Sequence, residues 1–142
     1  MLKSIEEASK NFCIHQIRLP HSLEDGIVKD RTLIAYIDIE AIDTKKYRVY
    51  IAAQQEFIQR VSMIFLEEEE SDEETLIDMT LETANLIIGS AKVIANSSEE
   101  SSFTITTPCF EKHDVFDFEY DDAKTLTVES DKISIAIKEL HG

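Results

Sequence analysis

The sequence predicts an α+β fold, in which an antiparallel β-sheet is covered by two central α-helices and a further helix lies at the N-terminus. Segments rich in β-branched and aromatic residues alternate apolar with polar positions on both sides of the chain's centre. Between about residues 54 and 95 the apolar spacing changes to three and four, which is typical of helices. Because alternating strands bury only one face, we expect the two central helices to cover it.

The composition indicates a single domain and argues against binding to nucleic acid or to membranes. A chain of 142 residues with 43% hydrophobic residues is expected to form one domain, spanning residues 1–142. The 29 acidic and 14 basic residues give a net charge of -15, which opposes binding to nucleic acid or to an anionic membrane. No apolar run approaches the roughly 18 residues of a membrane span, and acids occupy the N-terminal stretch where a signal peptide would be apolar. We therefore expect a cytoplasmic protein with a protein partner.

The first half of the chain is expected to contain a helix and a hairpin. Apolar residues recur at helical spacing from Leu2 to about Gln16, and Pro20 and Gly26 mark the loop that follows. Two strand-like segments, Arg31–Glu40 and Lys46–Ala53, are separated by a short polar turn. This arrangement predicts a β-hairpin.

Two helices are predicted in the centre of the chain. The first runs from Gln54 to about Leu66, with apolar positions three and four residues apart. Ser71 followed by Glu74 matches a capping box, so the second helix is predicted to start near Asp72 and to run to about Ala95.

Between the helices lies a loop in which seven of the eight residues from Glu67 to Glu74 are acidic. We interpret it as a solvated loop rather than a metal site.

Cys13 and Cys109 are far apart and form no CxxC motif, which favours two reduced thiols over a disulfide or a metal centre.

The last third of the chain predicts strands at Ser102–Thr107, Val115–Tyr120, Lys124–Glu129 and Lys132–Glu139. Short polar turns separate the last three, so we expect them to form an antiparallel meander.

A polar stripe distinguishes the second central helix. At about 100° per residue, Asp78, Glu82, Asn85 and Gly89 lie within roughly 60° of one another, and the apolar residues cluster opposite them. Such a stripe is often ordinary solvated surface. However, an asparagine and a glycine both lower helix propensity, the glycine by about 1 kcal/mol relative to alanine. A glycine lets another backbone approach, and an acid near an amide can bind a cation and orient a water molecule.

At this point the sequence resembles the CheC, CheX and FliY group of chemotaxis phosphatases. Their signature is Asp or Ser, three residues, Glu, two residues, Asn, and a proline some twenty residues later. Asp78, Glu82 and Asn85 in "DMTLETANLIIGSAK" match it, with 22 residues between Asn85 and Pro108. The resemblance includes the order of elements from about Arg31 onwards and implies a CheC-like fold.

The resemblance implies a single site, as in CheX-like members. CheC-like and FliY-like members carry two catalytic helices, but the first central helix here offers only Glu56 and Gln59, and no proline follows at the corresponding distance. We interpret this pair as ordinary surface.

The implied activity is hydrolysis of the aspartyl phosphate on a CheY-like response-regulator receiver domain. By this resemblance Glu82 pairs with the receiver's active-site lysine and Asn85 orients the attacking water, while the receiver holds the Mg²⁺ and this chain needs no cofactor. Asp78, Gly89 and Pro108 are expected to lie at or beside the partner contact. CheX-like members dimerise by joining sheets, which implies a possible homodimer.

Two alternatives remain open at the level of sequence. The same helix could serve a docking module that binds a receiver or a flagellar-switch or chemotaxis component without turnover. The acidic surface could instead belong to a scaffold that binds a basic protein patch.

Overall fold

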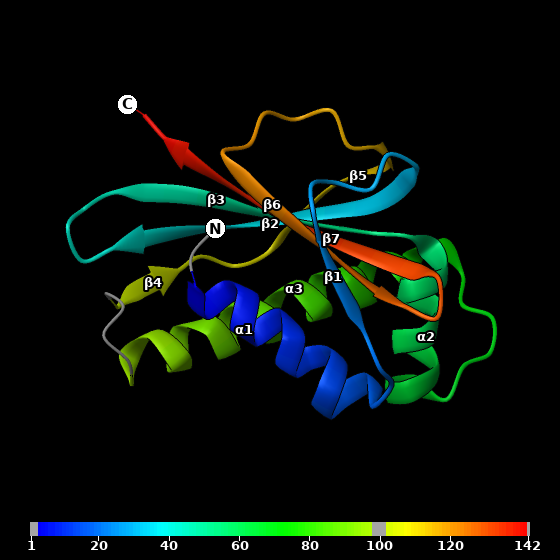
Figure 1. Ribbon diagram of the computed structural model, residues 1–142. Coiled ribbons are helices and arrows are strands. Elements are labelled where there is room, and N and C mark those ends of the chain that lie inside the picture. The colour runs from blue at the N-terminus through cyan, green and yellow to red at the C-terminus, as the bar shows by residue number, and fades with distance from the viewer. Residues whose placement is uncertain (1–2, 98–101, 142) are drawn as a thin grey trace.

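A single antiparallel sheet, with helices packed on one of its faces, organises the protein (Figure 1). The computed structural model describes residues 3–97 and 102–141. The helical elements are α1 (Lys3–Asn11), a π-helical continuation (Phe12–Ile17), α2 (Gln55–Leu66) and α3 (Glu73–Asn96). The strands are β1 (Ser22–Asp25), β2 (Arg31–Ala41), β3 (Lys46–Ala53), β4 (Phe103–Ile105), β5 (Cys109–Val115), β6 (Asp122–Val128) and β7 (Asp131–Leu140). Among the described residues, no helix has the length and apolar character that crossing a membrane requires.

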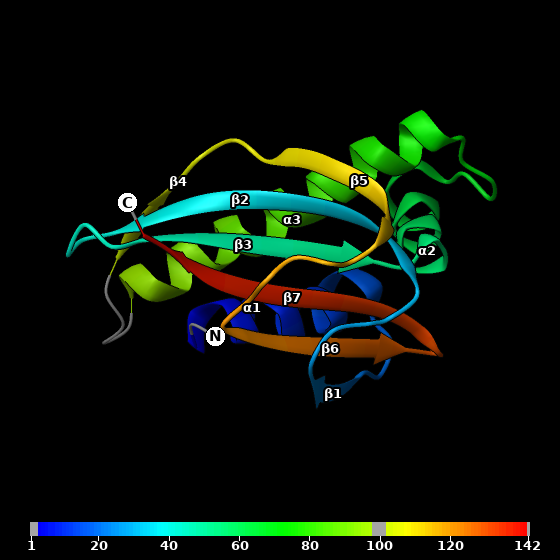
Figure 2. The same ribbon diagram turned by 90° about the horizontal axis from the view of Figure 1, so that it is seen from above.

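The centre of the sheet is the predicted hairpin. β2 and β3 pair from Leu33 opposite Ala53 to Glu40 opposite Lys46. On its other side β3 pairs with β7, and β7 pairs with β6, so the strand order is β1-β6-β7-β3-β2-β4, with β5 also on β2 (Figure 2). The predicted α+β class, with an antiparallel sheet, central helices and an N-terminal helix, is confirmed.

The predicted strand Val115–Tyr120 is wrong. The strand in this region is β5, which ends at Val115, and residues 116–121 cross the outer face of the sheet instead. There the Phe116 and Phe118 rings pack on Tyr50, with centroids 5.2 and 4.9 Å from its ring. Packing on the sheet surface therefore buries Phe116 and half-buries Phe118, without a hydrogen-bonded ladder.

The predicted three-stranded meander is also wrong, because its first strand is absent. β6 and β7 form the expected hairpin, but β5 pairs with β2 at the opposite edge of the sheet. β4 spans only Phe103–Ile105 and is shorter than the predicted strand Ser102–Thr107. Beyond its end, Thr106 donates its backbone N–H to the Asp38 carbonyl at 2.9 Å. β1, which the sequence indicated as loop, pairs with β6 through four exposed residues.

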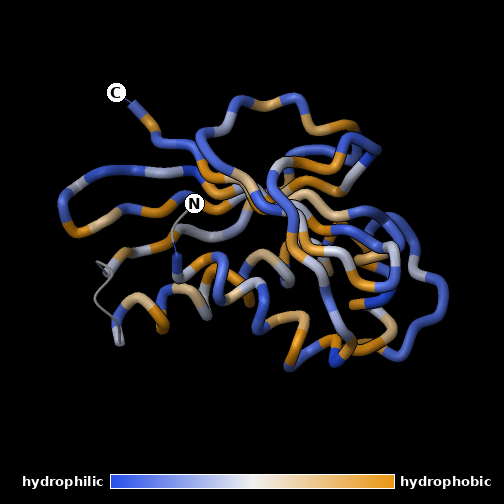
Figure 3. The backbone as a smooth tube through the Cα atoms, viewed as in Figure 1, coloured by the Kyte–Doolittle hydropathy of each residue, from blue (hydrophilic) through white to orange (hydrophobic). Residues whose placement is uncertain are grey.

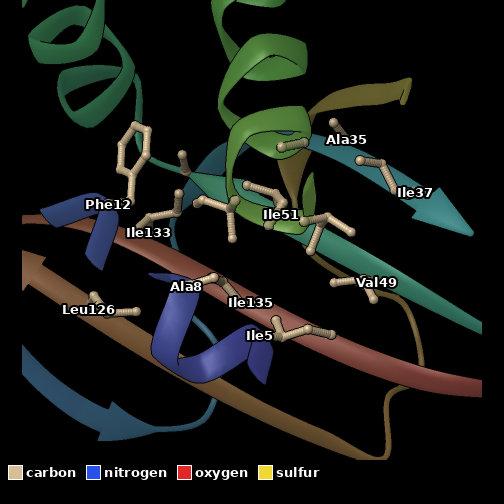
Figure 4. Packing of buried hydrophobic residues seen from close by; sticks show 14 of the residues in the cluster. Ile5, Ala8, Phe12, Ala35, Ile37, Val49, Ile51, Leu126, Ile133 and Ile135 are labelled. Atoms are coloured by element: carbon tan, nitrogen blue, oxygen red, sulfur yellow. The ribbon is translucent and has the colours of Figure 1, made fainter. Parts of the chain in front are cut away.

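The main core lies between the sheet and the helices (Figure 4). All three helices contribute to it, so the N-terminal helix joins the two central helices in covering this face of the sheet. Figure 4 shows Ile5 and Ala8 of α1, and Phe12 of the π-helical continuation, on the same side of the sheet as Ile51 of β3 and Ile135 of β7. Burial of this apolar area is the main favourable contribution to the stability of the fold.

Candidate active site

The stripe predicted on the second central helix lies on the outward face of α3. Asp78, Glu82 and Asn85 are exposed and Gly89 is partly exposed. The opposite face is buried against the core through Leu76, Thr80, Ala84, Ile87, Ile88 and Ala91. The predicted division of this helix into a core face and a solvated stripe therefore matches its burial.

Glu82 and Asn85 are neighbours on that face. They are three residues apart in an unbroken helix, which places Cβ atoms about 5–6 Å apart. Within residues 3–97 and 102–141, no hydrogen bond or ion pair engages either side chain. Both functional groups are thus free to meet a ligand that approaches α3 from solvent.

The helix beneath them is held firmly. The buried hydroxyls of Thr80 and Thr83 donate to the carbonyls of Leu76 and Met79, each at 2.7 Å, so they need no partner outside α3. α1, α2 and the sheet pack around the helix. A site on such a packed element holds its geometry better than one on a loop.

The start of α3 differs from the predicted capping box. The cap is Asp72, whose carboxylate accepts the backbone N–H of Thr75 at 2.8 Å. Hydrogen bonding to Thr75 lowers the pKa of Asp72. Ser71 instead donates its backbone N–H to the Gln59 side-chain oxygen at 2.8 Å, which fastens the acidic loop to α2.

Gly89 is not required by the packing of the chain itself. A Cβ added at this position would meet no atom within 4 Å, and the backbone φ is not in the left-handed region. The glycine leaves an open surface one turn beyond Asn85. Packing within the protein therefore does not explain why a residue of poor helix propensity stands there.

Pro108 lies apart from the other four predicted site residues. It belongs to the link of residues 106–108 between β4 and β5, just before the first residue of β5, and it is partly buried. The other four share one face of α3. The position of Pro108 fits a role in directing the chain into β5.

Sequence reasoning missed one exposed apolar residue on the same helix. The Val93 side chain is 66% exposed and follows Gly89 by four residues, so it extends the stripe by one turn. The helical spacing from Gly89 was the signal that could have identified it.

The remaining reactive groups offer no competing centre among the described residues. Cys13 is buried in the core, and desolvation raises the pKa of its thiol to about 11. No group of three or more His, Cys, Asp or Glu side chains in this part of the chain could hold a metal ion. Gln59 donates to the Glu68 carbonyl at 3.0 Å as well as holding Ser71, so its amide is occupied in fastening the loop.

A family model described as "Chemotaxis phosphatase CheX" matches residues 38–129, more than half of the chain. The chain belongs to the CheX family. The matched segment includes the whole of α3 and extends to β6, so it contains the stripe and Pro108.

Solved structures show the same CheX-type fold. CheX from Vibrio vulnificus superposes with a TM-score of 0.79 at 17% identity, covering 98% of each chain. A CheC-like superfamily protein from Shewanella sp. PV-4 gives 0.71 at 17% identity, covering 97% of this chain and 99% of its own. CheX in the CheX-CheY-BeF3-Mg²⁺ complex from Borrelia burgdorferi gives 0.69 at 16% identity, covering 96% of this chain and 97% of its own. A search of curated proteins finds no match.

Proposed function

We propose that this CheX-family protein hydrolyses the aspartyl phosphate of a phosphorylated, CheY-like receiver domain. The observation that carries the proposal is the adjacent, exposed and unengaged pair Glu82 and Asn85 on the outward face of α3. The fold supports it, since a relative of the same fold from Borrelia burgdorferi was solved as a complex of CheX with CheY, BeF3 and Mg²⁺.

Glu82 binds the partner in this proposal. Its carboxylate pairs with the receiver's active-site lysine, which orients the two proteins and brings α3 to the phosphorylated site. A charge pair that loses water at a protein interface favours one register of docking over others. Glu82 fits this role because no cation of the described chain competes for it.

Asn85 orients the attacking water. Its amide both donates and accepts hydrogen bonds, so it can hold a water molecule in line with the phosphorus atom. The neutral side chain also avoids adding a negative charge beside the phosphoryl group in a protein of net charge -15. Positioning is the main contribution, because an acyl phosphate is already activated and the receiver's Mg²⁺ balances the charge.

Asp78 and Gly89 border this pair. Asp78 lies one turn before Glu82, and Gly89 lies one turn after Asn85. In the proposed complex Asp78 flanks the contact, and Gly89 lets the receiver's backbone approach the helix. Pro108 contributes through the entry into β5 and makes no chemical contribution.

The test is the decay of a phosphorylated receiver domain with and without the protein. The proposal requires faster loss of the phosphoryl group at substoichiometric amounts of protein. Binding without faster decay would instead identify the docking module of the alternative hypothesis. An unchanged decay rate at saturating protein would contradict the enzymatic function.

We further propose that the protein forms a homodimer through a sheet edge. β4 and β5 lie end to end along β2 and form one edge of the sheet, and β1 forms the other. Such edges can pair with another chain. Sedimentation equilibrium should then give twice the chain mass of 16.2 kDa, whereas a monomer at all concentrations would contradict the dimer.

A further inference from the structure

The end of α2 exposes an unusual run of apolar residues. Its buried side faces the core, yet its last four side chains are all 40–46% exposed: Met63, Ile64, Phe65 and Leu66. A helix that faced only solvent would place polar residues there. Apolar surface concentrated in this way is typical of an interaction site.

Two of these residues line a groove of about 630 Å³. Met63 and Ile64 form one wall, and Ile17 and Leu19, from the segment that follows α1, form the other. Figure 1 shows the end of this segment beside α2, at the opposite end of α1 from the N-terminus. None of the residues that line the groove belongs to α3, so it is separate from the stripe.

The groove carries a negative rim. Arg60, the basic residue among its lining residues, is paired with Asp131 at 2.5 Å and with Glu129 at 3.8 Å. Glu56 and Glu69 also line it. The loop that contains Glu69 has five acids among its six residues from 67 to 72 and appears as a hydrophilic segment beside α2 in Figure 3.

Hydrogen bonds hold the acidic loop beside the groove. Gln59 accepts the backbone N–H of Ser71 at 2.8 Å and donates to the Glu68 carbonyl at 3.0 Å. Because Gln59 itself lines the groove, these contacts fix the acidic loop at its rim. The apolar walls and the negative charges therefore form one surface.

We propose that this groove docks an amphipathic segment of a partner protein, with apolar side chains flanked by lysine or arginine. The apolar residues would enter between the walls, as in helix-in-groove recognition, and the cations would face the acidic rim. Met63, with its flexible thioether, suits an adaptable contact. A second copy of this chain fits poorly, because it would bring another acidic loop and another net charge of -15.

The test uses a labelled helical peptide of leucine and lysine as the probe and measures its binding to the full chain by fluorescence anisotropy. Met63→Ser should weaken binding about tenfold, since it removes one large apolar contact. Ile42→Ser is the matched control: Ile42 is 78% exposed in the β2–β3 turn, and its loss should leave binding unchanged. Unchanged thermal unfolding of both variants will show that the fold is retained.

The rim is tested by removing equal charge at two places. Glu69→Gln with Glu70→Gln should weaken peptide binding and reduce its dependence on salt. Glu111→Gln with Glu119→Gln removes two exposed acids away from the groove and should change both quantities much less. Equal effects of the two pairs would show attraction by net charge alone and would overturn the proposal.

Four further results would overturn it. The first is equal binding of a peptide with glutamate in place of lysine, and the second is equal losses in the Met63 and Ile42 variants. The third is concentration-dependent self-association that Met63→Ser abolishes, because a second copy would then cover the groove. The fourth is loss of receiver binding in Met63→Ser, which would make the groove part of the receiver contact.

Discussion

The carboxylate of Asp72 accepts the backbone N–H of Thr75 at 2.8 Å and so closes the first turn of the helix that carries the candidate site. The following two residues, Glu73 and Glu74, place further negative charge at the positive end of the helix dipole. His113 of β5 approaches Glu73 at 2.8 Å, which ties this turn to the sheet edge.

Replacing Asp72 by alanine should destabilise the protein, because it leaves a helix N–H without its cap. Asp72→Asn is the matched control, since it keeps the accepting oxygen but cannot titrate. The pKa of Asp72 is lowered in the folded state, so its ionised form adds stability above its unfolded pKa, and this is lost as the pH falls through the folded value. Urea unfolding of both variants at neutral and acidic pH checks this; identical pH dependence in wild type and Asp72→Asn would contradict it.

Asn85→Ala should reduce the accelerated decay of the phosphorylated receiver by about a hundredfold, the usual effect of removing one aligned hydrogen-bonding group. Receiver binding and thermal stability should remain, because Asn85 is exposed and engages no described residue. Asn96→Ala removes an exposed amide near the end of the same helix and should keep full activity. Equal activity of the two variants would exclude Asn85 from the chemistry.

Glu82→Lys should weaken receiver binding at least about tenfold, because it places like charges at the proposed ion pair. Glu74→Lys makes the same change in net charge at another exposed position of α3 and should have a much smaller effect. Titration calorimetry at two salt concentrations measures both. A similar loss in both variants would indicate long-range attraction and would remove the specific role of Glu82.

Gly89→Ala separates stability from function. It should stabilise the free protein by up to about 1 kcal/mol, since the helix gains propensity. The added Cβ meets no atom within 4 Å, so no clash opposes this gain. The variant should nevertheless bind the receiver more weakly, because the Cβ occupies the surface that the partner approaches. Denaturant unfolding and receiver titration check the two effects, and unchanged binding would show that Gly89 lies outside the contact.

The periodic elements could be predicted from the sequence because their local patterns agree with the fold. The hairpin, the two central helices and the burial of α3 all follow spacings that tertiary contacts reinforce. The same spacing placed Glu82 and Asn85 on the solvated face.

The errors arose where long-range packing decides the structure. The charged segment of β5 was not predicted as a strand, yet it pairs with β2. The aromatic segment Val115–Tyr120 was predicted as a strand, yet Phe116 and Phe118 pack on Tyr50 instead of joining a ladder. By sequence, Ser71 and Asp72 could both cap α3. Ser71 instead bonds to Gln59, twelve residues earlier in the chain, and Asp72 is the cap. The groove beside α2 could not be predicted, because one of its walls follows α1.

The aromatic crossing of residues 116–121 makes the outer face of the sheet spectroscopically distinct. The chain has no tryptophan and four tyrosines. Tyr36 and Tyr50 meet edge to face there, and Tyr120 lies 6.1 Å from the Phe116 ring, whereas Tyr47 packs on the helical side. Near-ultraviolet circular dichroism therefore reports mainly on this outer layer and far-ultraviolet on the helices, so the two faces of one sheet can be followed separately without any added label.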